Sequence, residues 1–181
     1  MAEGQILCSV KMTEHNCFWK SFTMTQGNFY FLTDEYYDKF SDCGLMKNKD
    51  EDEFGSHGRP CYYCFISDGF YWMIPISSKV EKYKKIYNEK IKKYPNYDGI
   101  RFGYVNGRES AFLLQNICPV TDEYIACEYK IEHNTVPVTV SKALSKELNA
   151  IARKIIRYHK NGKRIVLSDL THIINELSKD R

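Results

Sequence analysis

Two strongly β-prone runs on either side of a turn constrain the fold of this chain more than any other feature. The runs are CYYCFI (61–66) and FYWMIPI (70–76), and Ser67-Asp68-Gly69 separates them. Aromatic and β-branched residues favour strands, and an Asp-Gly pair favours a tight turn between two strands. The sequence therefore predicts a β-hairpin over 61–76.

A basic amphipathic helix is predicted directly after this hairpin. Ser77 and Ser78 precede KVEKYKKIYNEKIKKY, in which apolar residues recur at helical spacing, and Pro95 and Asn96 end the pattern. A serine before the first turn is a favourable N-cap, because its hydroxyl accepts a hydrogen bond from a free backbone N–H. We expect a serine-capped helix whose apolar side carries Val80, Tyr83, Ile86 or Tyr87, and Ile91.

The remaining patterns extend this hairpin into an α+β domain. With 181 residues and 43% hydrophobic residues, the chain is long enough for one domain with a substantial core. We assign residues 24–181 to that domain and expect residues 1–23 to be an extension, either disordered or arising from a start placed too far upstream. Further strands are expected at 29–32, 99–104, 111–114, 124–131 and 136–140, and helices at 34–41, 142–159 and from Ser168-Asp169 onward.

The cysteines predict packed core thiols and no bound metal. Cys61 and Cys64 are three residues apart on a predicted strand, so their side chains would lie on opposite faces of the sheet. A structural zinc site also needs a second ligand pair of similar spacing, and the sequence contains none. The chain has no apolar run long enough to span a bilayer and no secretory signal pattern, so we expect a cytoplasmic protein.

Basic residues are concentrated in two segments of the second half, although the formal net charge is only +3. Residues 79–101 and 142–164 each contain eight lysines and arginines, and the second segment has Glu147 as its one acidic residue. These segments are either solvated helix faces or a surface that binds phosphates. Tyrosines between the lysines favour the second reading, because aromatic rings stack on unpaired bases. The predicted RNA-binding residues are Tyr83, Lys84, Lys85, Tyr87, Lys92, Lys93, Arg153, Lys154, Arg157 and Lys160.

An anion site is expected where the hairpin meets the basic helix. The segment Pro75-Ile-Ser-Ser-Lys79 combines hydroxyl groups, a cation and a helix N-terminus, which carries free N–H groups and a partial positive charge. Arg59 and Lys82 add positive charge nearby and could stabilise a phosphate that gains charge during cleavage. The alternative is ordinary helix capping by a serine beside exposed lysines.

Four segments together resemble the toxins of type III toxin–antitoxin systems, the ToxN/AbiQ superfamily, and most nearly its CptN branch. They are FYFLTDEYYDKF (29–40), GRPCYYCF (58–65), WMIPISSKVEKYKKIY (72–87) and GYVNGRESAFLLQNICPV (103–120). The resemblance covers roughly residues 28–178. It implies a compact, partly open antiparallel β-barrel of the Kid/MazF, SH3-like type, elaborated by helices.

The resemblance also implies an activity and a partner. Such toxins are endoribonucleases that need no metal or other cofactor: the 2′-hydroxyl of the RNA attacks the adjacent phosphate and leaves a 2′,3′-cyclic phosphate end. Their antitoxin is a repeat RNA folded as a pseudoknot, which the toxin processes and which inhibits it in a hetero-oligomeric assembly. These systems act in phage defence by abortive infection.

Site residues carry over by motif from the same resemblance. Ser77 and Ser78 match the hydroxyl pair of the family, with Ser78 the better candidate for contacting the scissile phosphate. Either Lys79 or Lys82 corresponds to the active-site lysine. Tyr36 matches a tyrosine on the first helix, Arg59 matches a basic residue before the hairpin, and His57 is a local candidate for proton transfer.

Two other functions fit the same sequence features. An RNA-binding module without catalysis would use the same basic surface and leave bound RNA intact. A protein-interaction component would depend on apolar patches instead, and the clustering of positive charge argues against it.

Overall fold

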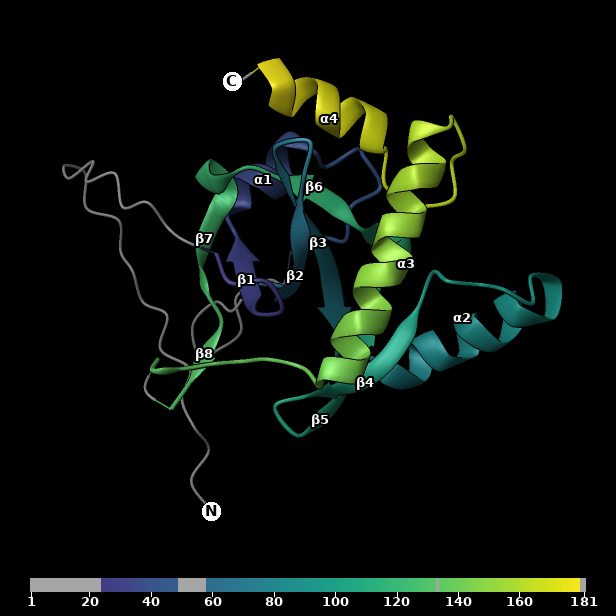
Figure 1. Ribbon diagram of the computed structural model, residues 1–181, viewed down its shortest axis with the longest axis horizontal. Helices are drawn as coiled ribbons and strands as arrows, with labels where there is room; N and C mark the ends of the chain where they lie inside the picture. The colour runs from purple at the N-terminus through teal and green to yellow at the C-terminus, as the bar shows by residue number, and fades with distance from the viewer. Residues whose placement is uncertain (1–23, 49–57, 133, 180–181) are drawn as a thin grey trace.

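The computed structural model is an α+β fold and describes residues 24–48, 58–132 and 134–179. Figure 1 shows the helices arranged around a sheet of antiparallel strands. The strands are β1 (Phe29–Leu32), β2 (Cys61–Ser67), β3 (Phe70–Ser77), β4 (Arg101–Val105), β5 (Arg108–Phe112), β6 (Cys118–Val120), β7 (Ile125–Glu128), β8 (Lys130–Ile131) and β9 (Val136–Pro137). The helices are α1 (Asp34–Lys39), α2 (Val80–Lys93), α3 (Lys142–Lys160) and α4 (Leu170–Lys179), with 3₁₀ turns η1 (Leu114–Asn116) and η2 (Asp122–Tyr124).

The predicted hairpin forms the centre of the main sheet. Its strand β2 pairs with β3 from Phe70 to Pro75, and β1 and then β7 extend the sheet beyond β2. On its other edge, β3 pairs with β6 through its first half and with β5 through its last two residues. The sheet order is β4-β5-β3-β2-β1-β7, with β6 beside β3. Each of these pairings is antiparallel. Among the described strands no pairing joins β4 to β7, so the sheet is open.

Both two-residue turns adopt the left-handed backbone that Asp-Gly and Asn-Gly pairs favour. Asp68 and Gly69, between β2 and β3, have φ values of 56° and 80°. Asn106 and Gly107, between β4 and β5, have φ values of 46° and 73°. Two consecutive positive φ angles are typical of type I′ turns, whose twist matches that of the strands they connect. The turns thereby set the register of each hairpin next to its turn.

The side chains of β2 divide between two cores on opposite faces of the sheet. Cys61 and Tyr63 belong to one core, and Tyr62 and Cys64 belong to the other. Phe65 lies on the same face as Cys64, because the pairing with β3 shifts register between Tyr63 and Phe65. Both cysteines are buried free thiols, which confirms their prediction as core residues on opposite faces.

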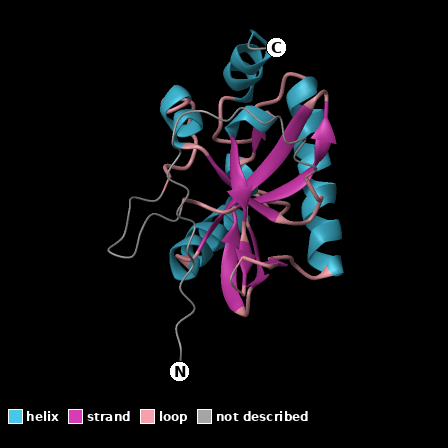
Figure 2. Cartoon of the chain, turned by 90° about the vertical axis from the view of Figure 1, so that its left-hand side faces the viewer, coloured by secondary structure: helices cyan, strands magenta, loops and turns pink. Residues whose placement is uncertain are grey.

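The helices cover the sheet on different sides (Figures 1 and 2). α3 packs its apolar stripe, including Leu148, Ile151 and Ile155, against the face that carries Tyr62 and Trp72. α1 and α4 contribute to the core on the other face. α2 lies beside β4 and β5, where Tyr83 packs with residues of β5 and the loop before β4. The N-terminus of α2 is therefore placed directly at the end of β3.

Several predicted boundaries are wrong, because strand pairing sets where each strand begins and ends. The strand expected at 111–114 runs instead over β5, because the tight turn at Asn106-Gly107 starts pairing immediately after it. The strand expected at 124–131 is split into β7 and β8, which pair with different partners. The 136–140 strand is reduced to β9, and β6 was not expected as a strand.

Within the described residues, no helix is both long and apolar enough to cross a membrane.

Candidate functional site

The structure brings Arg59 into direct contact with the Pro75–Lys79 segment. The Arg59 Nη1 group donates a hydrogen bond of 2.9 Å to the carbonyl oxygen of Ile76, the residue before Ser77. This contact follows from the pairing of β2 with β3, which places Cys61 opposite Pro75 and so brings the residues before β2 alongside the end of β3. The predicted proximity of Arg59 to the serines is thus present.

A loop segment that sequence reasoning did not single out holds the Arg59 side chain in place. The Arg59 Nε group donates to the carbonyl oxygen of Lys47 at 3.0 Å, and its backbone N–H donates to Asn48 Oδ1 at 2.7 Å. Asn48 in turn donates through Nδ2 to Asp34 Oδ1 at 2.7 Å. Among the described residues Arg59 Nη2 has no hydrogen-bond partner, so this nitrogen can donate to an anion.

The two serines of the segment differ in their surroundings. Ser77 is buried, and its Oγ accepts a hydrogen bond of 3.2 Å from the backbone N–H of Lys79. Ser78 is exposed, so its hydroxyl faces solvent. The predicted serine N-cap is wrong, because α2 begins at Val80 and its N-cap residue is Lys79. Ser77 instead fixes the backbone one residue before the helix, and Ser78 is the serine that a ligand can reach.

Both candidate lysines lie at the N-terminus of α2. Lys79 is its N-cap residue and Lys82 belongs to its first turn, and both side chains are exposed. The first backbone N–H groups of a helix have no partner within the helix, and the helix dipole adds partial positive charge there. Two N–H groups here are already used, since Lys79 N–H donates to Ser77 Oγ at 3.2 Å and Val80 N–H donates to the Ser78 carbonyl oxygen at 2.9 Å. The exposed side chains of Ser78, Lys79 and Lys82, with the partly exposed Arg59, form a set of donors and cations suited to a phosphate.

Tyr36 lies in the core, away from this exposed set. Its side chain is fully buried and its hydroxyl donates a hydrogen bond of 2.7 Å to the carbonyl oxygen of Pro119. Burial raises the pKa of the Tyr36 hydroxyl well above its ordinary value. A phosphate cannot reach this hydroxyl, so we leave Tyr36 out of the proposed site.

The neighbouring Tyr37 is closer to Arg59. Its hydroxyl lies 3.8 Å from the Cys61 sulfur, and burial raises its pKa while the charge of Arg59 acts in the opposite direction.

His57, the local candidate for proton transfer, lies outside the described residues. No group of three or more His, Cys, Asp or Glu side chains that could hold a metal occurs in the described part of the chain.

The tyrosines of α2 do not form the expected stacking surface. Tyr83 is buried against Ile100 and Leu113, so its ring cannot stack on a base. Tyr87 packs with Tyr97 and Phe102, at ring-centroid distances of 6.1 Å and 5.8 Å. Tyr83 and Tyr87 are unavailable for stacking because they occupy the apolar stripe of the helix, which faces the sheet.

The predicted lysines of α2 remain largely on the surface. Lys84 contacts Glu109 at 2.9 Å and Glu81 at 3.3 Å, and the hydrogen bond to Glu109 is the main reason that its pKa is raised. Its charge is thus partly balanced within the protein. Lys85, Lys92 and Lys93 are exposed and form no ion pair with another described residue.

The predicted cations of α3 differ in their environments, and three of the four contact residues outside the helix. Arg153 lies over the ring of Phe65 at 4.0 Å from its centroid. Lys154 forms an ion pair with Asp98 at 2.6 Å, and Lys160 forms one with Asp68 at 2.7 Å. Arg157 is exposed, with its guanidinium near the Tyr158 ring.

No protein-family model matches the chain, and no curated protein matches it either.

Proposed function

We propose that this protein is an endoribonuclease that cleaves RNA by attack of the 2′-hydroxyl on the adjacent phosphate. The observation that carries the proposal is the hydrogen bond from Arg59 to the Ile76 carbonyl oxygen, because it joins a fixed guanidinium to the Ser77–Lys79 segment and the start of α2. An exposed hydroxyl, a held arginine and exposed lysines at one helix N-terminus suit the charge that develops on a phosphate during in-line attack.

In the proposed reaction the 2′-oxygen forms a bond to phosphorus and the bond from phosphorus to the 5′-oxygen breaks. A base accepts the proton of the 2′-hydroxyl and an acid donates a proton to the departing 5′-oxygen. Arg59 Nη2 and the Ser78 hydroxyl contact the non-bridging oxygens, and Lys79 or Lys82 adds positive charge as the negative charge on the phosphate increases. The products are a 2′,3′-cyclic phosphate and a free 5′-hydroxyl.

The biological role in this proposal is that of a cytoplasmic toxin of a type III toxin–antitoxin system. Residues 24–181 form one toxin domain with a partly open barrel of the Kid/MazF type, and the antitoxin is a repeat RNA. The support is the sequence resemblance together with two exposed arginines of α3, Arg153 and Arg157. A surface of this kind, separate from the Ser78 site, suits a large RNA partner.

The test is RNA cleavage by purified protein in excess EDTA, with the fragment ends examined for 2′,3′-cyclic phosphate. We expect cleavage by the wild-type protein and a loss of at least about a hundredfold in Ser78→Ala or Lys79→Ala, as for removal of a group that stabilises developing charge. Lys90→Ala is the matched control for Lys79→Ala, since Lys90 is exposed near the other end of the same helix.

Two outcomes contradict the proposal in different ways. Intact RNA after long incubation, with folding and RNA binding confirmed, would identify an RNA-binding module without catalysis. Cleavage that Ser78→Ala and Lys79→Ala leave unchanged would place the active site elsewhere in the chain.

A further inference from the structure

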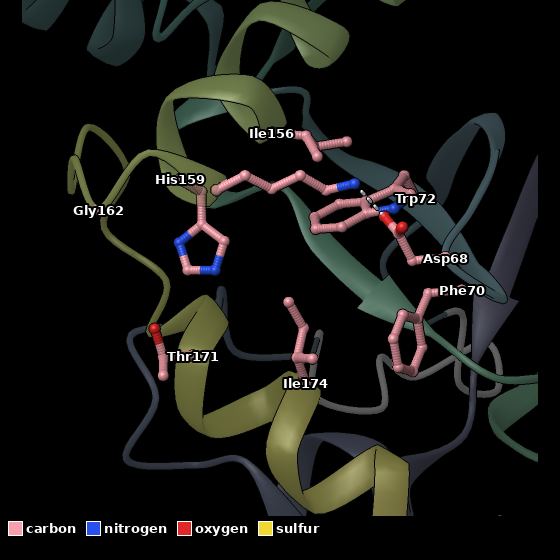
Figure 3. A pocket seen from close by; sticks show the side chains of 9 residues that line it. Asp68, Phe70, Trp72, Ile156, His159, Gly162, Thr171 and Ile174 are labelled. Atoms are coloured by element: carbon pink, nitrogen blue, oxygen red, sulfur yellow. Dashed lines mark ion pairs between the residues drawn. The ribbon is translucent and has the colours of Figure 1, made fainter.

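A half-open cavity of about 390 Å³ lies between the C-terminal end of α3, the start of α4 and the β2–β3 hairpin. Figure 3 shows Trp72 and Phe70 on one side of it, His159 and Thr171 on the other, and Ile156 and Ile174 completing its wall. This volume falls at the lower end of the roughly 300–1,000 Å³ found for small-molecule sites. The cavity lies at the start of β3, whereas Ser77 lies at the opposite end of that strand.

This cavity combines an apolar floor with polar groups at its edge. Trp72 and Phe70 are almost fully buried and form part of that floor. The ion pair between Lys160 and Asp68, drawn as a dashed line in Figure 3, crosses one edge. The hydrogen bond from Lys160 lowers the pKa of Asp68, which keeps that carboxylate ionised. A flat ring with polar edges matches this combination of apolar floor and polar rim.

A second recess of about 110 Å³ adjoins the first and has a different character. The two share His159, Gly162 and Thr171, so they are parts of one depression. Lys163 and Arg164 line the second recess, which opens at the N-terminus of α4. The carboxylate of Asp169 also lines it, and one of its oxygens accepts the backbone N–H of His172 at 3.1 Å as a helix cap.

One residue beside the second recess carries a buried hydroxyl without a partner among the described residues. Ser168 is 1% exposed and lines this recess, and its Oγ has no hydrogen-bond partner among the described residues. Buried hydroxyl groups nearly always have a partner, because an unmade hydrogen bond is costly. The segment that carries Ser168 is held on both sides, since Leu167 N–H donates to Gln115 O at 2.7 Å and Asp169 N–H donates to Cys43 O at 2.8 Å.

The charge around the depression favours an anion. Two cations, Lys163 and Arg164, line the second recess against one carboxylate, that of Asp169. Lys163 and Arg164 are exposed, so neither has lost its charge to burial. An apolar recess next to a cationic one fits a ligand with a flat ring at one end and a phosphate at the other.

We propose that this depression binds one nucleoside 5′-phosphate unit, with its base in the larger recess and its phosphate near Lys163 and Arg164. The edge of the base meets His159, Thr171 and Asp68, which together offer donors and acceptors for it. This assignment rests on the proposed function, in which the ligand is RNA, and it adds a second RNA contact far from the Ser78 site. A free mononucleotide has the same chemistry, so the experiment separates the two sources.

The test measures binding of a short unstructured RNA to the Ser78→Ala protein, which is expected to leave the RNA uncut. We expect the double variant Lys163→Ala/Arg164→Ala to weaken binding by at least about tenfold, because hydrogen bonds to charged groups are lost. The matched control is Lys142→Ala/Lys146→Ala, which removes the same charge from exposed positions at the other end of α3. Equal weakening by the two double variants would overturn the proposal and leave the cleavage site untouched.

A second measurement locates the base and identifies its source. RNA containing 4-thiouridine is expected to crosslink to peptides from residues 156–174, and crosslinks confined to residues 77–93 would contradict the proposal. Adenosine 5′-phosphate that competes with the RNA identifies a site open to free mononucleotides, and RNA binding without such competition identifies an RNA-specific site. Competition by inorganic phosphate as strong as that by adenosine 5′-phosphate would overturn the assignment of the larger recess to a base.

Discussion

Replacing Tyr36 with phenylalanine removes one buried hydroxyl and leaves the aromatic ring in place. The ring packs against Phe40 and Tyr124 at centroid distances of 5.0 Å and 5.5 Å, and these contacts do not require the oxygen. The hydroxyl donates to the carbonyl oxygen of Pro119 at 2.7 Å. Its loss therefore tests whether Tyr36 stabilises the fold or takes part in catalysis.

The expected effect is on stability. Leaving a buried acceptor without its donor costs about 1–3 kcal/mol of the free energy of unfolding. For a chain of this size each kcal/mol lowers the melting temperature by roughly 2–4 °C, so a loss of about 2 kcal/mol corresponds to roughly 4–8 °C. RNA cleavage at a temperature well below the transition is expected to be unchanged, because the hydroxyl is out of reach of a substrate.

The assay pairs thermal unfolding with RNA cleavage on the same samples. Tyr104→Phe is the control, since Tyr104 is 69% exposed and its hydroxyl makes no hydrogen bond to a described residue. This control is expected to stay within about 0.5 kcal/mol of wild type. A Tyr36→Phe protein that melts at the wild-type temperature but no longer cleaves RNA would refute the reasoning.

Two further perturbations test other parts of the structure. Gly44→Ala is expected to be more destabilising in urea than Gly27→Ala: both glycines have positive φ angles, but a Cβ atom at Gly44 would meet the backbone oxygen of Leu167 at 2.5 Å, whereas one at Gly27 meets nothing within 4 Å. Equal losses would show that the 167–169 segment moves freely away from Gly44. Burial raises the pKa of the Cys61 thiol from 9.0 to about 12, so unfolded chains release this proton first as the pH rises above about 9, and the urea midpoint is expected to fall there. Cys61→Ala is expected to flatten this fall, and an unchanged pH dependence would contradict a buried neutral thiol.

The central hairpin and both tight turns follow from short-range rules. Aromatic and β-branched runs around Asp68-Gly69 specify two strands and a two-residue turn, and the same applies to Asn106-Gly107. β6 illustrates what such rules miss. It is short and contains Pro119, and it exists because Cys118 and Val120 lie opposite Met73 and Tyr71 of β3, which a local pattern does not reveal.

In the candidate site too, some features follow from a short stretch of sequence and others depend on residues far apart in the chain. The position of Ser78 before a basic helix is visible in the sequence, but the bonds of Arg59 to Lys47 and Asn48 join it to a loop with no periodic pattern. The sequence predicts Tyr83 both on the apolar side of its helix and as an RNA-binding residue, and its helical spacing with Val80 places it toward the core. The burial of Tyr36 depends on Pro119, 83 residues further along the chain.

Because β3 pairs with other strands on both edges, the distance between its two ends is fixed. From Phe70 to Ser77 the strand advances about 3.3 Å per residue, which amounts to roughly 23 Å. Neighbouring strands pair with both ends, so the strand cannot stretch, and its two ends keep their separation when surface loops move. Any single molecule that contacts both ends must match this length. The choice of such a partner would then depend on the distance between the two ends of β3 as well as on the residues at each end.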